Sequence, residues 1–223
     1  MAEFKPNSSR RRFLQNIGLL GGALTTAAGA LAGDDPFAAL PPQVWRNSRR
    51  NGLVMIRHPA PAGITWHAEI THAGEPGEPL MVTGQVFAPD GRTPARGVTV
   101  YAYNTDAQGY YGENHTEYPP RIYGWMKTDD AGTFELLTVK PGRYPGMQVP
   151  AHIHFSLWGE GYPPQWVEDL RFEGDSYLTP AMIAEDRIRG EYATIQRLTP
   201  RSDGVLHCSF RIRLRTDSNF RAA

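Results

Sequence analysis

From residue 80 onward, turn signals divide the sequence into short stretches that alternate apolar and polar residues. This pattern limits the fold more than any other feature. The clearest example is VLHCSFRIRLR (205–215), in which every second residue from Leu206 to Leu214 is apolar. Side chains of an extended chain point alternately to opposite faces, so this stretch presents one apolar and one polar face. The sequence therefore predicts a strand with one buried side near the C-terminus.

Further strands are expected in the same region. The stretches are LMVTGQVFA (80–88), GVTVYAY (97–103), TFELLTV (133–139), AHIHFSLWG (151–159) and WVEDLRF (166–172). Turn sequences such as PDG and DDAG separate them, and the 23 glycines and 19 prolines suit frequent turns. One helix is expected at TPAMIAEDRIRG, where Thr179 can cap and Pro180 can take the first helical position. The predicted class is all-β: an antiparallel β-sandwich with an N-terminal arm and at most one or two short helices.

The N-terminal 32 residues read as an export signal. SRRRFLQ precedes an uncharged stretch that ends in Ala30-Leu31-Ala32, a small-x-small pattern that predicts cleavage before Gly33. An arginine pair, then any residue, then Phe-Leu resembles the twin-arginine signal of bacteria. The uncharged stretch is too short for a membrane span. We therefore expect residues 1–32 to be a twin-arginine signal peptide, and the mature protein to be periplasmic or extracellular with no stable membrane anchor.

The remaining chain is expected to have two parts. Residues 33–79, rich in Pro, Gly and Arg, predict an extended arm that wraps the domain or a partner subunit, so a homo-oligomer is one expectation. Residues 80–223 form the predicted β-sandwich domain. Lys+Arg and Asp+Glu are both 23, which argues against a nucleic-acid partner. The single cysteine, Cys208, excludes an intrachain disulfide and a cysteine-based metal site.

The candidate chemistry lies in PAHIHF (150–155). In a strand, His152 and His154 point to the same face, where they are either a satisfied polar pair or two ligands of a metal. Two ligands are too few for a tight site. Glu160, Glu168 and Asp169 are the nearby carboxylates, and tyrosines lie in AQGYYGEN and KPGRYPG. A phenol, with a pKa near ~10, becomes a ligand only against a strongly charged cation such as Fe(III).

Several motifs together resemble the intradiol ring-cleavage dioxygenases, a family that includes protocatechuate and catechol dioxygenases. The motifs, in order, are YNTDAQGYYG, TDDAGTFELLTVKPGRYP, PAHIHF and LRFEGD. The resemblance, from about Leu80 to about Asp175, implies a bound Fe(3+) held by Tyr111, Tyr144, His152 and His154. Tyr111 is chosen over Tyr110 because the family's tyrosine lies two residues after the glycine, here Gly109.

The same resemblance implies the reaction. Tyr144 and His154 would be axial, and Tyr111, His152 and a hydroxide equatorial. A small aromatic diol of the catechol type would displace the hydroxide and Tyr144, which makes Tyr144 a catalytic residue. Cleavage by O2 between the two hydroxyl carbons would then give a muconate-type diacid.

Two positions depart from the family pattern. Val149 stands where relatives usually carry an arginine, and Asp169 stands where they often carry glutamine. A carboxylated substrate is therefore less expected. Residues 33–79 also do not resemble the helical N-terminal region of catechol dioxygenases. The substrate and the oligomeric state are not given by the sequence.

Two other functions are compatible with parts of the pattern. A cupin would share H-x-H, but Glu160 follows His154 by more residues than a cupin motif allows, and no second motif supplies another histidine. The other alternative is an iron-binding sandwich module with little or no dioxygenase activity, because fold alone does not imply activity.

Overall fold

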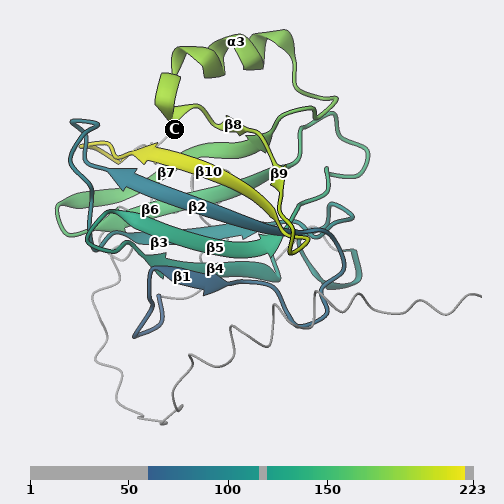
Figure 1. Ribbon diagram of the computed structural model, residues 1–223, viewed down its shortest axis with the longest axis horizontal. Coiled ribbons are helices and arrows are strands. Elements are labelled where there is room, and N and C mark those ends of the chain that lie inside the picture. Colours follow the sequence, from purple (N-terminus) through teal and green to yellow (C-terminus); the bar gives the residue numbers. More distant parts are fainter. Residues whose placement is uncertain (1–59, 116–119, 219–223) are drawn as a thin grey trace, which may run out of the picture.

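The computed structural model describes residues 60–115 and 120–218. They form two five-stranded sheets packed face to face, with one short helix at one side (Figure 1). The predicted β-sandwich with few helices is thus confirmed. The first sheet has the strand order β1-β5-β2-β10-β9, and the second has β4-β3-β6-β7-β8.

The strands of the first sheet are β1 (His67–Glu69), β2 (Pro79–Phe87), β5 (Thr133–Val139), β9 (Thr199–Pro200) and β10 (Leu206–Arg213). Those of the second sheet are β3 (Thr99–Asn104), β4 (Ile122–Lys127), β6 (His152–Gly159), β7 (Tyr162–Phe172) and β8 (Ile195–Gln196). All five stretches expected as strands between residues 80 and 172, and the C-terminal one, form strands. Strand β4 was not expected from the sequence.

The sheets are mixed rather than purely antiparallel. The pairs β1–β5, β2–β10 and β7–β8 are parallel, whereas β2–β5, β3–β4, β3–β6 and β6–β7 are antiparallel. Strand β10 comes from the end of the chain and lies beside β2 over eight paired residues, Leu206 to Arg213. Strands joined by a tight turn, such as β6 and β7, pair antiparallel, whereas strands far apart in sequence can pair in either direction.

The core lies between the two sheets and follows the alternation of the sequence. In β10, Cys208, Phe210 and Ile212 are buried, while Ser209 and Arg213 are exposed. From the facing sheet, Phe155 packs with its ring centroid 5.2 Å from that of Phe210. The apolar face predicted for the C-terminal strand is therefore confirmed.

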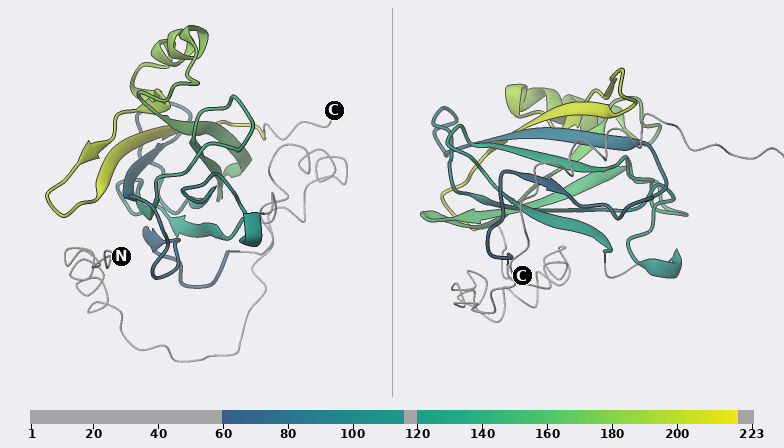
Figure 2. Two further views of the ribbon diagram at one scale, coloured as in Figure 1. Left: turned by 90° about the vertical axis from the view of Figure 1, so that its right-hand side faces the viewer. Right: turned by 60° about the horizontal axis from the view of Figure 1, so that its bottom comes forward.

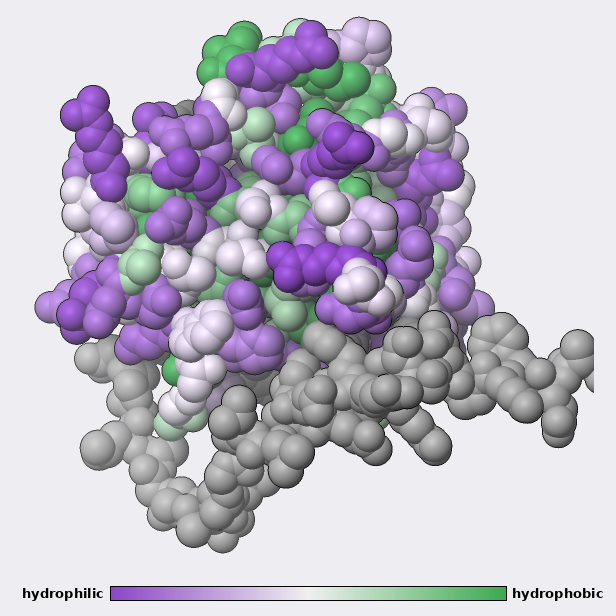
Figure 3. Space-filling model, in the orientation of Figure 1, coloured by the Kyte–Doolittle hydropathy of each residue, from purple (hydrophilic) through white to green (hydrophobic). Residues whose placement is uncertain are grey.

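The helix α3 (Pro180–Ile188) lies outside the sandwich (Figure 2), and the turns η2 (Glu113–His115) and η3 (Gly190–Tyr192) are 3-10 helices. The hydroxyl of Thr179 accepts a hydrogen bond from Met182 N (3.2 Å), and Pro180 is the first helical residue, which confirms the expected cap. Apolar side chains gather around α3 on the otherwise mostly hydrophilic face in Figure 3, and Ile188 is 87% exposed.

The predicted signal peptide, residues 1–32, and most of the predicted arm lie outside the described residues, so the export and domain-boundary predictions stay predictions. Within residues 60–79 the chain forms β1 and enters β2 at Pro79. Among the described helices, none combines the length and apolar character that a membrane span requires.

Candidate metal centre

The two histidines are positioned by β6, a central strand between β3 and β7. Ile153 and Phe155 are fully buried in the core, so His152 and His154 lie on the opposite, outer face of the sheet. Their Nε2 atoms are 3.0 Å apart. The prediction that the two imidazoles share one face is confirmed.

Tyr111 is positioned by a tight turn that follows β3. Asp106 Oδ1 accepts hydrogen bonds from the backbone N–H groups of Gln108 (2.9 Å) and Tyr110 (3.0 Å). Gly109 has a φ of 95°, in the left-handed region that disfavours other residues. This turn directs the two adjacent tyrosines differently: the Tyr110 ring stacks on His115, whereas the Tyr111 side chain is buried beside the histidines.

Tyr144 follows β5 in a second loop, and the two tyrosine loops touch backbone to backbone. Gly142 N donates to Asp106 O (2.8 Å), and Thr105 Oγ1 donates to Gly142 O (2.8 Å). A Cβ on Gly109 would lie 1.9 Å from Arg143 O, and one on Gly142 would lie 2.5 Å from Ala107 O. Both glycines are therefore required for the loops to approach closely enough to bring Tyr111 and Tyr144 together.

An ion-pair network holds the Tyr111 turn in place. The guanidinium of Arg121 donates to Glu75 Oε1 (2.7 Å) and to Asp106 Oδ2 (3.2 Å), and both acids are buried. The backbone N–H of Arg121 donates to Tyr111 O (2.8 Å). Because buried carboxylates are costly without a partner, Arg121 ties the turn to the segment before β2.

The four residues that the sequence analysis selected converge on one point. Tyr111 Oη lies 2.7 Å from His154 Nε2 and is in hydrogen-bond contact with Tyr144 Oη. Tyr144 Oη lies 2.9 Å from His152 Nε2 and 3.2 Å from His154 Nε2. Two phenol oxygens and two imidazole nitrogens thus come from three segments of the chain: the turn after β3, the loop after β5 and β6.

The groups next to Nδ1 of each histidine indicate that the Nε2 atoms are suited to bind a cation. His152 Nδ1 lies 2.7 Å from Pro150 O, and His154 Nδ1 lies 2.7 Å from Asp169 Oδ1. Since a carbonyl and a carboxylate only accept, each neutral ring carries its proton on Nδ1 and its lone pair on Nε2. Two nitrogen lone pairs therefore face each other across 3.0 Å, next to two phenol oxygens. A bound cation removes this repulsion and uses all four donors.

Burial is the main cause of the pKa shifts of Tyr111 and His152. It raises the pKa of Tyr111 far above that of an ordinary phenol, and Tyr144 adds to the rise. Burial, together with His154, lowers the pKa of His152. His152 thus offers a neutral nitrogen, and the buried phenol of Tyr111 ionises only against a strong positive charge. This donor chemistry is suited to a trivalent cation such as Fe(III) more than to a weakly charged one.

Two further residues belong to the site: Asp169, which the sequence analysis named among the nearby carboxylates, and Tyr103, which it did not single out. Carboxylate and imidazole ligand atoms of Asp169, His152 and His154 all lie within 4.8 Å of one another. The Tyr103 ring stacks on His154, with centroids 4.5 Å apart. Tyr103 is opposite His154 in the β3–β6 register, which strand pairing could have suggested. Asp169 could not be placed in this way because the β6–β7 register shifts between Ile153 and Phe155.

Other aromatic side chains extend from the cluster across the same outer face. Tyr101 and Trp158 are buried there, and Tyr123, Trp125 and Trp166 pack against them. Val149, one of the two departures from the family pattern, is partly buried just before β6.

The known proteins that this chain resembles are ring-cleaving dioxygenases. The profile of a family described as Dioxygenase matches residues 60–216. The protocatechuate 3,4-dioxygenase beta chain of Burkholderia cepacia is 35% identical over 117 residues, covering 47% of this chain and 49% of the relative. The 6-chlorohydroxyquinol 1,2-dioxygenase of Cupriavidus pinatubonensis is 31% identical over 122 residues, covering 47% and 44%. The chain thus spans about half the length of these curated relatives.

Solved structures share the fold at lower identity. The 3-chlorocatechol 1,2-dioxygenase of Rhodococcus opacus superposes with a TM-score of 0.53 at 21% identity, covering 71% of this chain and 70% of that one. An intradiol ring-cleavage dioxygenase from Tetranychus urticae has a TM-score of 0.52 at 20% identity, covering 74% and 95%.

Proposed function

Because the chain belongs to the intradiol ring-cleavage dioxygenase family, we propose that it uses Fe(III) and O2 to cleave the ring of a catechol-type diol between its hydroxyl carbons. The product would be a muconate-type diacid. The observation that carries the proposal is the convergence of two phenol oxygens and two imidazole nitrogens, whose closest contacts are at most 3.2 Å.

In this proposal Tyr111, Tyr144, His152 and His154 hold the metal. When bound, ferric iron supplies a Lewis acid that holds the diol as its anion and draws electron density from the ring, which exposes a ring carbon to O2. The remaining work belongs to the protein side chains. His152 and His154 would keep their Nε2 atoms toward the metal, because His152 Nδ1 is hydrogen-bonded to Pro150 O and His154 Nδ1 lies 2.7 Å from the Asp169 carboxylate.

The two tyrosines have different roles in the proposal. Tyr111 is 6% exposed and lies in the turn fixed by Asp106 and Arg121, which supports a permanent ligand. Tyr144 is only partly buried and lies in a loop whose next residues are exposed. Tyr144 would therefore be the more readily displaced of the two tyrosine ligands, and its Oη would accept a proton from the diol.

The charges around the cluster support a diol without a carboxylate group. Asp169 places a negative charge beside the histidines, and apolar Val149 contributes no positive charge at the start of β6. A carboxylate on the substrate would be repelled by Asp169 at short range. The ring of Tyr103, stacked on His154, adds an aromatic side chain beside the cluster that is compatible with an uncharged ring.

The test is oxygen consumption by protein of known iron content against catechol, hydroxyquinol, alkyl catechols and 3,4-dihydroxybenzoate. We expect uptake with the uncharged diols, ring-opened diacid as the product, and a weaker response to the carboxylated diol. Tyr144→Phe should lower kcat/KM about 100-fold or more, since it removes the proton acceptor. Tyr110→Phe is the matched control, because the Tyr110 ring stacks on His115 instead of facing the cluster.

An iron-loaded, red-brown protein that consumes no oxygen with any of these diols would overturn the proposal in favour of an iron-binding module. A colourless protein that does not retain iron would overturn both functions.

We also propose that the chain is exported by the twin-arginine route. The support is the arginine pair and the Ala30-Leu31-Ala32 pattern in the sequence. N-terminal sequencing of protein recovered from the periplasm or medium should begin at Gly33. Full-length chain retained in the cytoplasm would contradict the proposal, and replacing the arginine pair by lysines should block export.

A further inference from the structure

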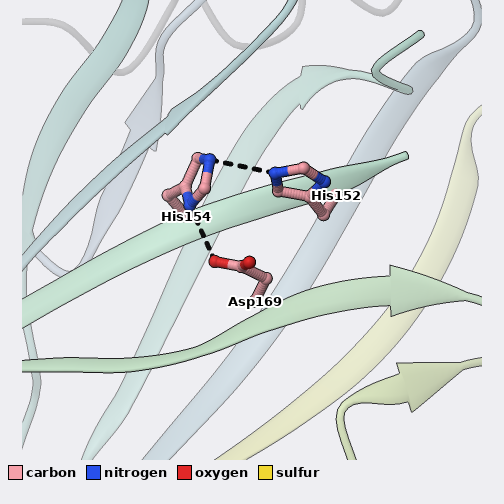
Figure 4. Close-up of side chains that lie close together, drawn as sticks. All are labelled: His152, His154 and Asp169. Carbon is pink, nitrogen blue, oxygen red and sulfur yellow. Dashed lines mark hydrogen bonds and ion pairs between the residues drawn. The ribbon is translucent and has the colours of Figure 1, made fainter. Parts of the chain in front are cut away.

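The two imidazoles of the cluster are supported by different acceptors. His152 Nδ1 faces a neutral backbone carbonyl, Pro150 O, at 2.7 Å. His154 Nδ1 faces the carboxylate of Asp169, also at 2.7 Å. Figure 4 shows that the nitrogen of His154 nearest Asp169 is not the one that faces His152. One imidazole thus has a full negative charge behind it, and the other has only a dipole.

The position of Asp169 indicates support of a ligand rather than metal binding. Its oxygen and the histidine nitrogens lie within 4.8 Å of one another, close enough to consider a further ligand. Oδ1, however, lies against Nδ1 of His154, on the side of the ring away from the Nε2 that meets Tyr111 Oη at 2.7 Å. The carboxylate therefore acts on the site through His154.

Arg171 places a positive charge near the second oxygen of this carboxylate. Its Nη2 lies 3.9 Å from Asp169 Oδ2, so each carboxylate oxygen has a different partner. Arg171 is paired with His152 in the β6–β7 register, and its side chain is 21% exposed. Side chains at directly opposed positions of two strands lie on the same face, which keeps the guanidinium beside the site.

We propose that Asp169, which lies beside Arg171, is a positioning residue whose negative charge favours the Nδ1-protonated form of His154 and makes this ring the more electron-rich of the two imidazole ligands. This inference depends on one part of the proposed function, namely that the bound metal is Fe(III). A fixed negative charge behind a ligand increases electron donation to the metal, and outer partners of this kind commonly change metal affinity about 10- to 100-fold. The opposite charge on Arg171 moderates this effect.

The consequence can be tested by charge changes of opposite sign. Asp169→Asn keeps an oxygen that accepts the Nδ1 proton but removes the negative charge. Arg171→Met removes the positive charge and leaves the carboxylate. A more electron-rich iron raises the energy of the phenolate-to-iron absorption band. Asp169→Asn should therefore shift the visible band to longer wavelength, and Arg171→Met to shorter wavelength.

The matched control is Glu168→Gln, the adjacent carboxylate on β7. Glu168 Oε1 lies 3.5 Å from Arg189 Nη2, so this carboxylate pairs with another element of the fold. The control should leave the band unchanged. Retention of ferric iron against a chelator should fall about 10- to 100-fold in Asp169→Asn and stay within about twofold in Glu168→Gln.

Three results would overturn the inference: an unshifted band in Asp169→Asn, shifts of equal size in Glu168→Gln, or shifts of the same sign in Asp169→Asn and Arg171→Met. Same-sign shifts are what simple loosening of the site would produce. If Asp169→Asn does not fold, as judged by circular dichroism, the sign of the Arg171→Met shift decides. None of these measurements requires turnover, so a protein that binds iron but cleaves no diol would refute the proposed function and leave this inference intact.

Discussion

Replacement of Gly109 by alanine tests how the two tyrosine loops are held together. A Cβ at this position would lie 1.9 Å from Arg143 O and 2.7 Å from the carbon of the same carbonyl. Because a carbon and a carbonyl oxygen normally approach no closer than about 3.3 Å, the loops would have to separate by roughly 1.4 Å. The turn that carries Tyr111 would then move away from the loop that carries Tyr144.

Two costs add up in this variant. A non-glycine residue at the φ of 95° found for Gly109 costs about 1–2 kcal/mol, and forcing an atom into a packed interface costs about 1–3 kcal/mol more. The free energy of unfolding should therefore fall by roughly 2–5 kcal/mol, which corresponds to a decrease in Tm of about 5–15 °C. Because a displacement near 1 Å at a reacting centre can cost about 100-fold in rate, kcat/KM should fall by about that factor.

Gly204→Ala is the matched control. Gly204 has a φ of 83°, and a Cβ there would meet nothing within 4 Å. The Gly204→Ala variant has the same unfavourable backbone conformation but no clash. Its free energy of unfolding should therefore fall by about 1–2 kcal/mol, and it should retain its iron. Urea unfolding, iron content and the visible band of both variants are the measurements. A Gly109→Ala protein as stable as Gly204→Ala, with undiminished iron and colour, would refute the idea that backbone contact sets the distance between the phenols.

The remaining predictions concern groups outside the metal cluster. Arg121→Met should destabilise the protein by about 3 kcal/mol in urea unfolding, because it leaves buried Glu75 and Asp106 without their shared guanidinium. Arg96→Met, which removes an ion pair between side chains 78% and 91% exposed, should change stability by less than about 0.5 kcal/mol; equal losses would contradict the role of the Arg121 network. Burial raises the pKa of the Cys208 thiol to about 12, so at pH 8 it is protonated in the folded protein. A disulfide reagent should therefore label Cys208 only after unfolding in urea, and rapid labelling of the native protein at pH 8 would show that the thiol is accessible.

Much of the fold was predictable because strand periodicity is a local property. Alternation in 205–215 identified the buried face of β10, and TPAMIAEDRI contained its own cap and first-turn proline. The same alternation placed His152 and His154 on one face before any partner was known. Strand β4 was missed because it contains Gly124 and carries apolar side chains on both faces, Ile122 and Met126 on one and Tyr123 and Trp125 on the other, so its alternation is weak.

The sequence by itself determined which residues are extended and which side chains share a face, because both depend only on near neighbours in the chain. The tertiary structure decided which segments meet. The parallel pairing of β10 with β2, the contact between the loops of Gly109 and Gly142, and the approach of Asp169 to His154 across a shifted register all depend on distant segments. A period of two fixes the face of a strand but not its neighbour, and the carboxylate behind His154 comes only from the neighbouring strand β7.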